Sequence, residues 1–211
     1  MGNHKPGTFL AVAALLMAAG AVAFAAWRLT SIRATSSFPD EESETYAVYS
    51  ALISELFTKE NVKLLVIQEQ TLVNSNPDHL KATTPEDGIK DLKECCPSVD
   101  EDALKDYDTK NLASSKLVAN FSLPLKYVLL NTSELHELQH AHETLREFSE
   151  RYPGADGLIS LSRVGFNKDY SQAYVRVEFI FCPLCSFGEE ILLKKQGGTW
   201  KVAESFGGWV S

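Results

Sequence analysis

The chain has 211 residues, of which 45% are apolar and 23% charged, a composition typical of a globular protein that buries a core without help from a metal. The formal net charge is −8 at pH 7, from 28 acidic and 20 basic residues. Such an acidic balance repels phosphate groups, so nucleic acid is excluded as an expected partner.

The first segment in chain order is an uncharged, mostly apolar run at the N-terminus. Residues 9–27 as a helix at ~1.5 Å per residue would span about 28 Å, close to one hydrocarbon core, and would contact the membrane if uncleaved. The alanine-rich stretch 21–25 instead offers the small-x-small pattern that signal peptidase accepts. Residues 1–27 are therefore predicted to be a signal peptide or a transmembrane anchor. Both interpretations give an extracytoplasmic protein, either secreted or periplasmic, or held by a single membrane pass.

A polar tether and then a folded part follow this leader. Residues 28–42 are rich in Ser and Thr and contain one proline, which is typical of a linker. We expect a single α+β domain over 43–211. Its first element is an amphipathic helix over 44–58, because apolar residues there recur at spacings of three and four.

Strands and helices alternate in the middle of the chain. The β-branched, apolar segment 62–70 predicts a mostly buried strand, and 126–130 predicts a short one. Two short helices are expected over 85–96 and 98–114, separated by a proline. An Asn-Thr-Ser sequence is expected to cap a longer helix that covers 132–151.

From residue 157 onwards the sequence changes character. Period-two alternation with short turns predicts a four-stranded antiparallel β-meander, with strands at 157–166, 173–181, 189–196 and 199–210. Val175 and Val177 fall on one side of the second strand, which we expect the 132–151 helix to cover, while the other side is wetter. The predicted fold class is therefore α+β: an N-terminal hydrophobic helix, several helices, then the C-terminal four-stranded antiparallel β-meander.

This order of helices and then a curved sheet that ends in a Trp-bearing strand resembles the cone-shaped folds of the nuclear transport factor two-like superfamily. The likeness is one of architecture and rests on no motif. Segments 46–53, 162–179 and 197–211 are also similar to segments of uncharacterised exported bacterial proteins. That resemblance implies an export setting and brings no catalytic residue to this chain.

A zinc-protease signature occurs in the last predicted helix. Residues 136–140 spell H-E-x-x-H, in which two histidines one turn apart bind Zn²⁺ and the Glu accepts a proton from zinc-bound water. On a helical wheel both imidazoles lie more than about 130° from the centre of the apolar face, beside carboxylates. A solvated helix face, with no metal and no cofactor, is therefore the preferred interpretation. Two metal-binding hypotheses compete with it: a zinc-dependent hydrolase in which Glu137 is catalytic and His136 and His140 bind the metal, and weak metal binding by these histidines with Glu143.

Four cysteines suggest disulfide bonds in an exported chain: Cys95, Cys96, Cys182 and Cys185. A bridge between the two adjacent cysteines would be strained. A local bridge within C-P-L-C and a cross-link from the 85–96 helix to that hairpin loop both stay open. The C-x-x-C pair, Cys182 and Cys185, could also be a redox site, and the four cysteines could form a zinc site or remain free thiols.

The wetter face of the predicted sheet carries four aromatic side chains that are candidates for ligand contact: Tyr174, Trp200, Phe206 and Trp209. Packing in the core or at the sheet edge would also explain these residues. The sequence has no glycine-rich phosphate loop and no G-x-S-x-G motif. We therefore expect a non-enzymatic, exported or membrane-anchored envelope module that binds a protein partner or a small ligand, with a zinc-dependent hydrolase as the alternative function.

Overall fold

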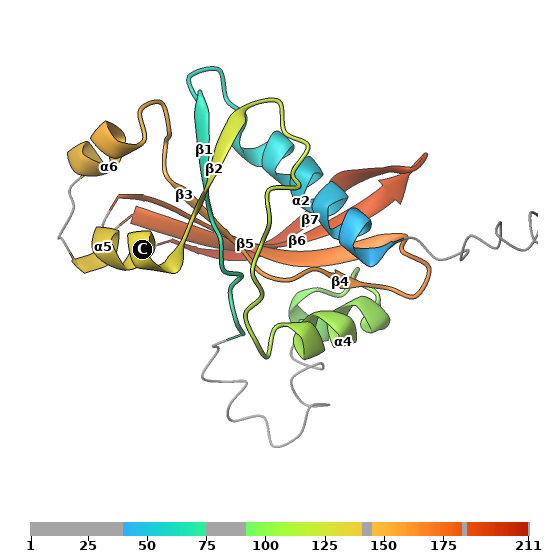
Figure 1. Ribbon diagram of the computed structural model, residues 1–211. Coiled ribbons are helices and arrows are strands. Elements are labelled where there is room, and N and C mark those ends of the chain that lie inside the picture. The colour runs from blue at the N-terminus through green and yellow to red at the C-terminus, as the bar shows by residue number, and fades with distance from the viewer. Residues whose placement is uncertain (1–39, 75–91, 141–144, 183–184, 211) are drawn as a thin grey trace, which may run out of the picture. The chain divides into compact units, whose positions relative to one another are not determined.

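A mixed sheet of seven strands organises the chain (Figure 1). The computed structural model describes residues 40–74, 92–140, 145–182 and 185–210. The strands follow the order β2-β1-β3-β5-β6-β7, and β4 pairs with β5 beside this row. β1 is parallel to both β2 and β3, and the other pairs are antiparallel. The bounds are β1 Leu64–Gln68, β2 Lys126–Leu130, β3 Leu158–Leu161, β4 Gly165–Phe166, β5 Gln172–Cys182, β6 Cys185–Gln196 and β7 Thr199–Val210.

The predicted four-stranded meander is wrong as a description of this sheet. β3, β5, β6 and β7 do follow one another as antiparallel neighbours, but β1, β2 and β4 also belong to the sheet, which is therefore mixed and has seven strands. The apolar sequences of β1 and β2 predict that both segments are strands. They do not predict which strands will pair with them, because parallel pairing links segments far apart in sequence. The strand expected over 157–166 is split into β3 and β4.

The transmembrane prediction also needs correction. Within the described ranges, no helix is long and apolar enough to cross a membrane. Residues 1–39, which hold the hydrophobic leader and most of the expected tether, lie outside the described residues. The N-terminal hydrophobic helix of the predicted fold class is therefore not among the elements of the structure.

α2 (Glu41–Phe57) is the helix whose buried side chains pack into the main hydrophobic core. Its first turn is capped by Asp40, whose carboxylate accepts a hydrogen bond from the backbone N–H of Ser43 at 3.3 Å. The three acidic residues of that turn suit the positive end of the helix dipole. The helix predicted over 44–58 is confirmed and begins slightly earlier. Its fully buried residues include Val48, Leu52 and Ile53.

The two faces of the sheet have different covers. Val175 and Val177 of β5 belong to the core cluster that contains the buried side chains of α2. On the opposite face, α4 (Glu101–Lys110) packs on β4, β5 and β6, while α5 (Thr132–His140) and α6 (Leu145–Arg151) pack near β1, β2 and β3. Figure 1 shows α2 and α4 on opposite sides of β5.

The cover predicted for Val175 and Val177 is therefore wrong. α2 lies on that side, and the expected 132–151 helix consists of two described helices on the other side, with 141–144 between them outside the described residues. A helical period shows which face of a helix is apolar, but it does not show which face of a sheet that helix will cover.

α4 lies very close to β4. Asp100 caps the helix by accepting from the backbone N–H of Asp102 at 2.9 Å. A Cβ atom at Gly165 of β4 would lie only 2.4 Å from the carbonyl oxygen of Ala103, so only glycine permits this approach. The helix expected over 98–114 is thus confirmed in a shorter form. Of the expected 85–96 helix, the structure describes a single helical turn at 92–95.

Candidate ligand-binding cavities

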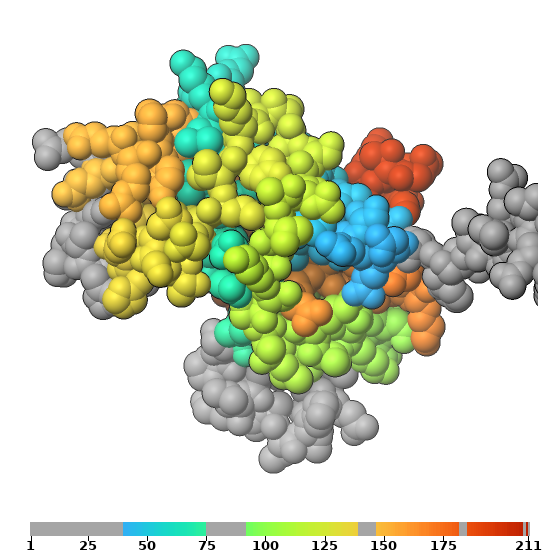
Figure 2. All heavy atoms as spheres, viewed as in Figure 1, coloured from blue at the N-terminus to red at the C-terminus, as the bar shows by residue number. Residues whose placement is uncertain are grey.

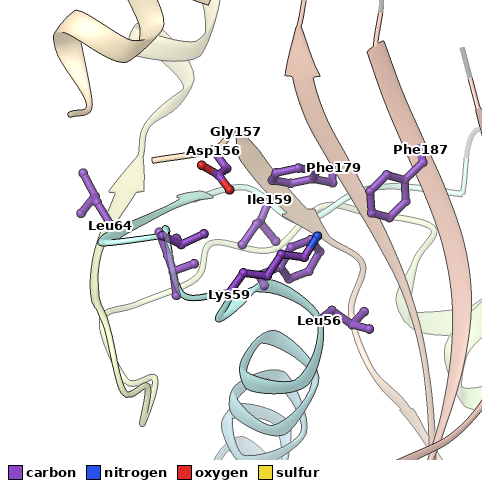
Figure 3. A pocket seen from close by; sticks show the side chains of 11 residues that line it. Leu56, Lys59, Leu64, Asp156, Gly157, Ile159, Phe179 and Phe187 are labelled. Carbon is purple, nitrogen blue, oxygen red and sulfur yellow. The ribbon is translucent and has the colours of Figure 1, made fainter. Parts of the chain in front are cut away.

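The first cavity lies at the C-terminal end of α2, between that helix and strands β1, β3, β5 and β6 (Figure 3). We call it the α2-end cavity; its volume is ≈ 70 Å³. Its walls are mostly apolar and include Leu56, Phe57, Leu64, Ile159, Phe179 and Phe187. These residues come from separate segments of the chain, which meet only in the folded protein.

Aromatic rings form the wall on the side of β5 and β6. The ring centroid of Phe179 lies 5.1 Å from that of Phe57 and 5.7 Å from that of Phe187. Phe179 also stacks on Phe181 at 5.9 Å, and Phe181 is 39% exposed. The series of rings therefore leads from the core to the surface, and it offers a large apolar contact area with few rotatable bonds.

A glycine keeps this wall in place. A Cβ atom at Gly157 would lie 2.4 Å from the carbonyl oxygen of Ile180 and 2.8 Å from the ring of Phe179. The backbone just before β3 can therefore approach β5 only because residue 157 has no side chain.

Two charged side chains stand among the apolar ones, Lys59 and Asp156 (Figure 3). The Lys59 ammonium has no hydrogen-bond or ion-pair partner among the residues that the structure describes. Asp156 accepts one long hydrogen bond, 3.5 Å from the side-chain nitrogen of Asn61. The α2-end cavity is therefore an apolar space with one available positive charge and one weakly bonded negative charge.

A second cavity, of ≈ 250 Å³, lies beside the N-terminal half of α2. We call it the Arg163 cavity. The segment 115–118 and the residues just before β4 complete its walls. In Figure 2, α2 (blue) and the 110–120 segment (green) lie side by side on the face that is shown. Its charged residues are Glu41, Glu42, Lys110, Lys116 and Arg163.

Hydrogen bonds fix the two tyrosines of the Arg163 cavity. The Tyr49 hydroxyl donates to the carbonyl oxygen of Ser162 at 2.7 Å, and the Tyr46 hydroxyl accepts from the backbone N–H of Val118 at 2.7 Å. Burial raises the pKa of the Tyr49 hydroxyl far above its ordinary value. This phenol therefore stays neutral and serves as a fixed donor.

The HELQH segment is placed on α5, which ends at its second histidine. Leu135 and Leu138 of α5 pack on the cluster of Val66, Leu130 and Leu158, as the helical wheel predicts. Phe148 and Tyr152, from the C-terminal end of the region predicted as one helix, pack on the same cluster. The apolar face of this region was therefore predicted correctly, even though the region is not one described helix.

Two polar side chains of HELQH are described, those of His136 and Glu137. His136 and Glu137 are exposed, and Glu137 lies 3.6 Å from a guanidinium nitrogen of Arg151 on α6. The side chains of His140 and Glu143 lie outside the described atoms. No group of three His, Cys, Asp or Glu side chains within the described part of the chain is arranged to hold a metal ion. Because the second histidine falls outside that part, zinc binding by HELQH stays a prediction.

The structure places three of the four candidate aromatic residues inside the protein. Tyr174 and Phe206 are buried beneath α4, and Trp200 is buried beside α2, where its indole nitrogen donates to Glu44 at 2.7 Å. The backbone of Trp209 belongs to β7, and its side chain lies outside the described atoms. None of the three described side chains lines either cavity.

Sequence reasoning missed the two aromatic residues of the sheet that line the α2-end cavity, Phe179 and Phe187. A signal for one of them was present, because the alternation of β5 puts Phe179 on the same side as Val175 and Val177. Nothing in the local pattern shows that α2 ends where it leaves Phe179 uncovered.

Of the two disulfide alternatives, the cross-link from the 85–96 region to the hairpin loop is wrong. Cys95 and Cys96 are free thiols whose sulfur atoms lie 2.8 Å apart, and no two described cysteine side chains are at disulfide-bonding distance. Cys96 is fully buried and its sulfur lies 3.4 Å from the Tyr174 hydroxyl. Burial raises the pKa of the Cys96 thiol to about 12, so this sulfur is a poor nucleophile at neutral pH. Cys182 and Cys185 are register partners, and the Cys182 side chain lies outside the described atoms.

No protein-family model matches this chain, and no curated protein and no solved structure is similar to it at a significant level. What the structure itself defines is an α+β protein with a mixed seven-stranded sheet, whose described residues form an apolar cavity at the end of α2 and a polar cavity beside Arg163. The resemblances to cone-shaped folds and to exported bacterial proteins stay predictions.

Proposed function

We propose that the chain is a non-enzymatic binding module whose α2-end cavity holds the apolar part of a small ligand with one negative charge. The observation that carries this proposal is the aromatic-lined space beside Lys59, whose ammonium has no described partner. An extracytoplasmic setting belongs to the same proposal and rests on the apolar residues 9–27 of the sequence alone.

The size of the cavity suits a small apolar group. Its volume of ≈ 70 Å³ is several times the ~10–15 Å³ that one water molecule needs on the same measure. Burial of about 100 Å² of apolar ligand surface would contribute about 2.5 kcal/mol. A short alkyl chain or a single ring therefore fits both the space and the chemistry of its walls.

The charges beside the cavity select the charge of the ligand. Lys59 attracts an anionic group, and such a pair at a partly exposed site contributes about 0.2–1 kcal/mol. Asp156 lines the same cavity and opposes a second negative charge on the ligand. A monoanion with an apolar body pairs with Lys59, whereas Asp156 would repel the additional charge of a dianion and Lys59 would repel a cation.

Hexanoate is a suitable probe, because it combines a short alkyl chain with one carboxylate. Two-dimensional amide NMR of the labelled protein should show saturable shifts at Leu56, Ile159 and Phe179. Hexylamine, which has the same chain and the opposite charge, should bind more weakly. Shifts that are confined to residues away from the α2-end cavity would contradict the proposal.

Two substitutions separate the apolar and the ionic contributions. Leu56→Trp fills the cavity and should abolish hexanoate binding, whereas Leu112→Trp at a 77% exposed position should not. Lys59→Gln should remove the preference for hexanoate over hexylamine, and Lys201→Gln on exposed β7 serves as its matched control. Equal binding by Leu56→Trp and the wild type would show that the cavity is not the site.

A further inference from the structure

The Arg163 cavity contains two opposite charges that do not pair with each other. Arg163 and Glu42 both line it, and their charged groups are not within salt-bridge distance. Neither side chain pairs with another oppositely charged side chain among the described residues. A cation and an anion that line one cavity and leave each other unneutralised are a binding arrangement for a ligand that carries both charges.

Arg163 is held firmly in position. Its backbone N–H donates to the side-chain oxygen of buried Asn111 at 2.8 Å, and its carbonyl oxygen accepts from the Asn111 amide at 3.0 Å. One guanidinium nitrogen, Nη1, donates to the carbonyl oxygen of Lys110 at 3.1 Å. A guanidinium has five N–H donors, so most of this fork has no described protein acceptor. The group is therefore preorganised to bind a carboxylate.

The other charges in this cavity are already neutralised. Lys110 lies 2.6 Å from both Glu41 and Asp106, and Lys116 lies 3.1 Å from Glu69. Among the described residues, the cavity therefore has one available positive group, Arg163, and one available negative group, Glu42.

Glu42 and Tyr46 are one helical turn apart, so they lie on the same face of α2. The negative charge of Glu42 contributes to the raised pKa of Tyr46, although burial is the larger cause. Since the Tyr46 hydroxyl accepts its described hydrogen bond from Val118, its own proton is available to donate to a ligand. Leu117, Val118 and Val164 provide apolar walls beside these groups.

We propose that the Arg163 cavity binds a small zwitterion of the α-amino acid class, with its carboxylate on Arg163 and its ammonium on Glu42. The Tyr46 hydroxyl donates to the same carboxylate, and the ligand side chain lies against the apolar walls. A volume of ≈ 250 Å³ accommodates a molecule of this size. The described walls of the two cavities have no residue in common, so this proposal does not depend on the α2-end cavity.

Calorimetric titration of the full-length protein with each free L-amino acid in turn tests the proposal. At least one should bind with a stoichiometry of one. Its methyl ester lacks the carboxylate and its deaminated analogue lacks the ammonium, so each should bind about tenfold more weakly or worse. Absence of binding by every amino acid, or equal affinity for the deaminated analogue, would overturn the proposal.

Variants of the two charged residues locate the site. Arg163→Gln and Glu42→Gln should each weaken binding by about tenfold or more. Glu55→Gln on the exposed side of the same helix and Lys201→Gln on β7 are charge-matched controls that should bind as the wild type does. If Arg163→Gln does not fold, Glu42→Gln decides, because Glu42 is exposed and makes no described side-chain hydrogen bond. Unchanged binding by Glu42→Gln would then refute the assignment.

Discussion

Glu44 joins α2 to the sheet through both of its carboxylate oxygens. Oε2 accepts from the indole nitrogen of Trp200 at 2.7 Å, and Oε1 lies 2.5 Å from the ammonium of Lys195. Glu44→Ala would leave the indole N–H of a buried tryptophan without a partner, which costs about 1–3 kcal/mol. We therefore expect urea denaturation to show a free energy of unfolding lower by about this amount.

The same substitution at Glu55 is the control for this prediction. Glu55 is an exposed residue of the same helix, so Glu55→Ala should change the free energy of unfolding by no more than about 0.5 kcal/mol. A similar loss in both variants would mean that the bond to Trp200 is not what stabilises the helix against the sheet.

Glu190 gives a prediction about pH. It lies across from Arg176 on the face opposite α2, and burial raises the pKa of its carboxyl although Arg176 opposes the shift. The folded state therefore holds this proton more tightly than the unfolded state, and ionisation of Glu190 costs stability as the pH rises through the folded pKa. Glu190→Gln cannot ionise and should remove that cost.

Thermal unfolding between about pH 4 and pH 7, on either side of the ordinary glutamate pKa, measures this effect. The melting temperature of Glu190→Gln relative to the wild type should rise with pH across this range. Glu55→Gln removes an exposed carboxylate and should show no such trend. A difference between Glu190→Gln and the wild type that is constant with pH would contradict the prediction.

At the scale of elements, α4 packs so closely on β4 that no side chain fits between them at residue 165. A Cβ atom at Gly165 would lie 2.4 Å from the carbonyl oxygen of Ala103 and 2.5 Å from the backbone nitrogen of Tyr107. Gly165→Ala must move the helix away from the strand, and we expect a loss of about 1–3 kcal/mol in the free energy of unfolding.

Gly207 of β7 provides the matched control for Gly165. No described atom lies within 4 Å of the position that a Cβ atom would take there, so Gly207→Ala should be nearly neutral in the same denaturation experiment. If both alanine variants lost the same stability, the loss would come from strand glycines in general and not from the contact with α4.

The spacing of apolar residues in the sequence predicts the position of many of these helices and strands. The predicted bounds are most accurate where that spacing continues without a break from one end of the element to the other. β2 and β7 have the bounds expected from sequence, 126–130 and 199–210. α2 has nearly the expected bounds, and α4 is shorter than expected. The predicted cover of the sheet was wrong, because an apolar helix face does not specify its partner.

Neither cavity could be predicted from the sequence. The α2-end cavity exists because the end of α2 and several strands converge around one space, and no local pattern records where a helix stops covering a sheet. The Arg163 cavity depends on Asn111, which positions Arg163 from about fifty residues away in the chain. The HELQH motif is visible in the sequence, but its described side chains line neither cavity. A short motif gives the spacing of its residues and not their surroundings in the fold.

At the scale of the whole molecule, the sheet ties together segments from residue 64 to residue 210. β1 lies between β2 and β3 and is hydrogen-bonded to both. The β1–β2 side of the sheet is therefore joined to the β5–β7 side through β3. Residues 40–211 form one compact unit. We therefore expect a 40–211 fragment to unfold in a single cooperative transition in urea.

Far-ultraviolet circular dichroism and tryptophan fluorescence should give the same midpoint for this fragment. The fluorescence reports on Trp200 and Trp209, since Trp27 lies outside the fragment. Two separated midpoints would show that the β1–β2 side of the sheet unfolds independently of the β5–β7 side, and the single-transition prediction would fail.

The position of β1 also has a consequence for synthesis. Both neighbours of β1 come later in the chain, and the second of them, β3, begins at Leu158. While the ribosome adds the intervening residues, the nascent β1 exposes apolar side chains and two unpaired edges, a state that favours aggregation. A chaperone that holds this early segment until β3 has emerged should therefore raise the yield of folded protein more than one that acts only on the completed chain.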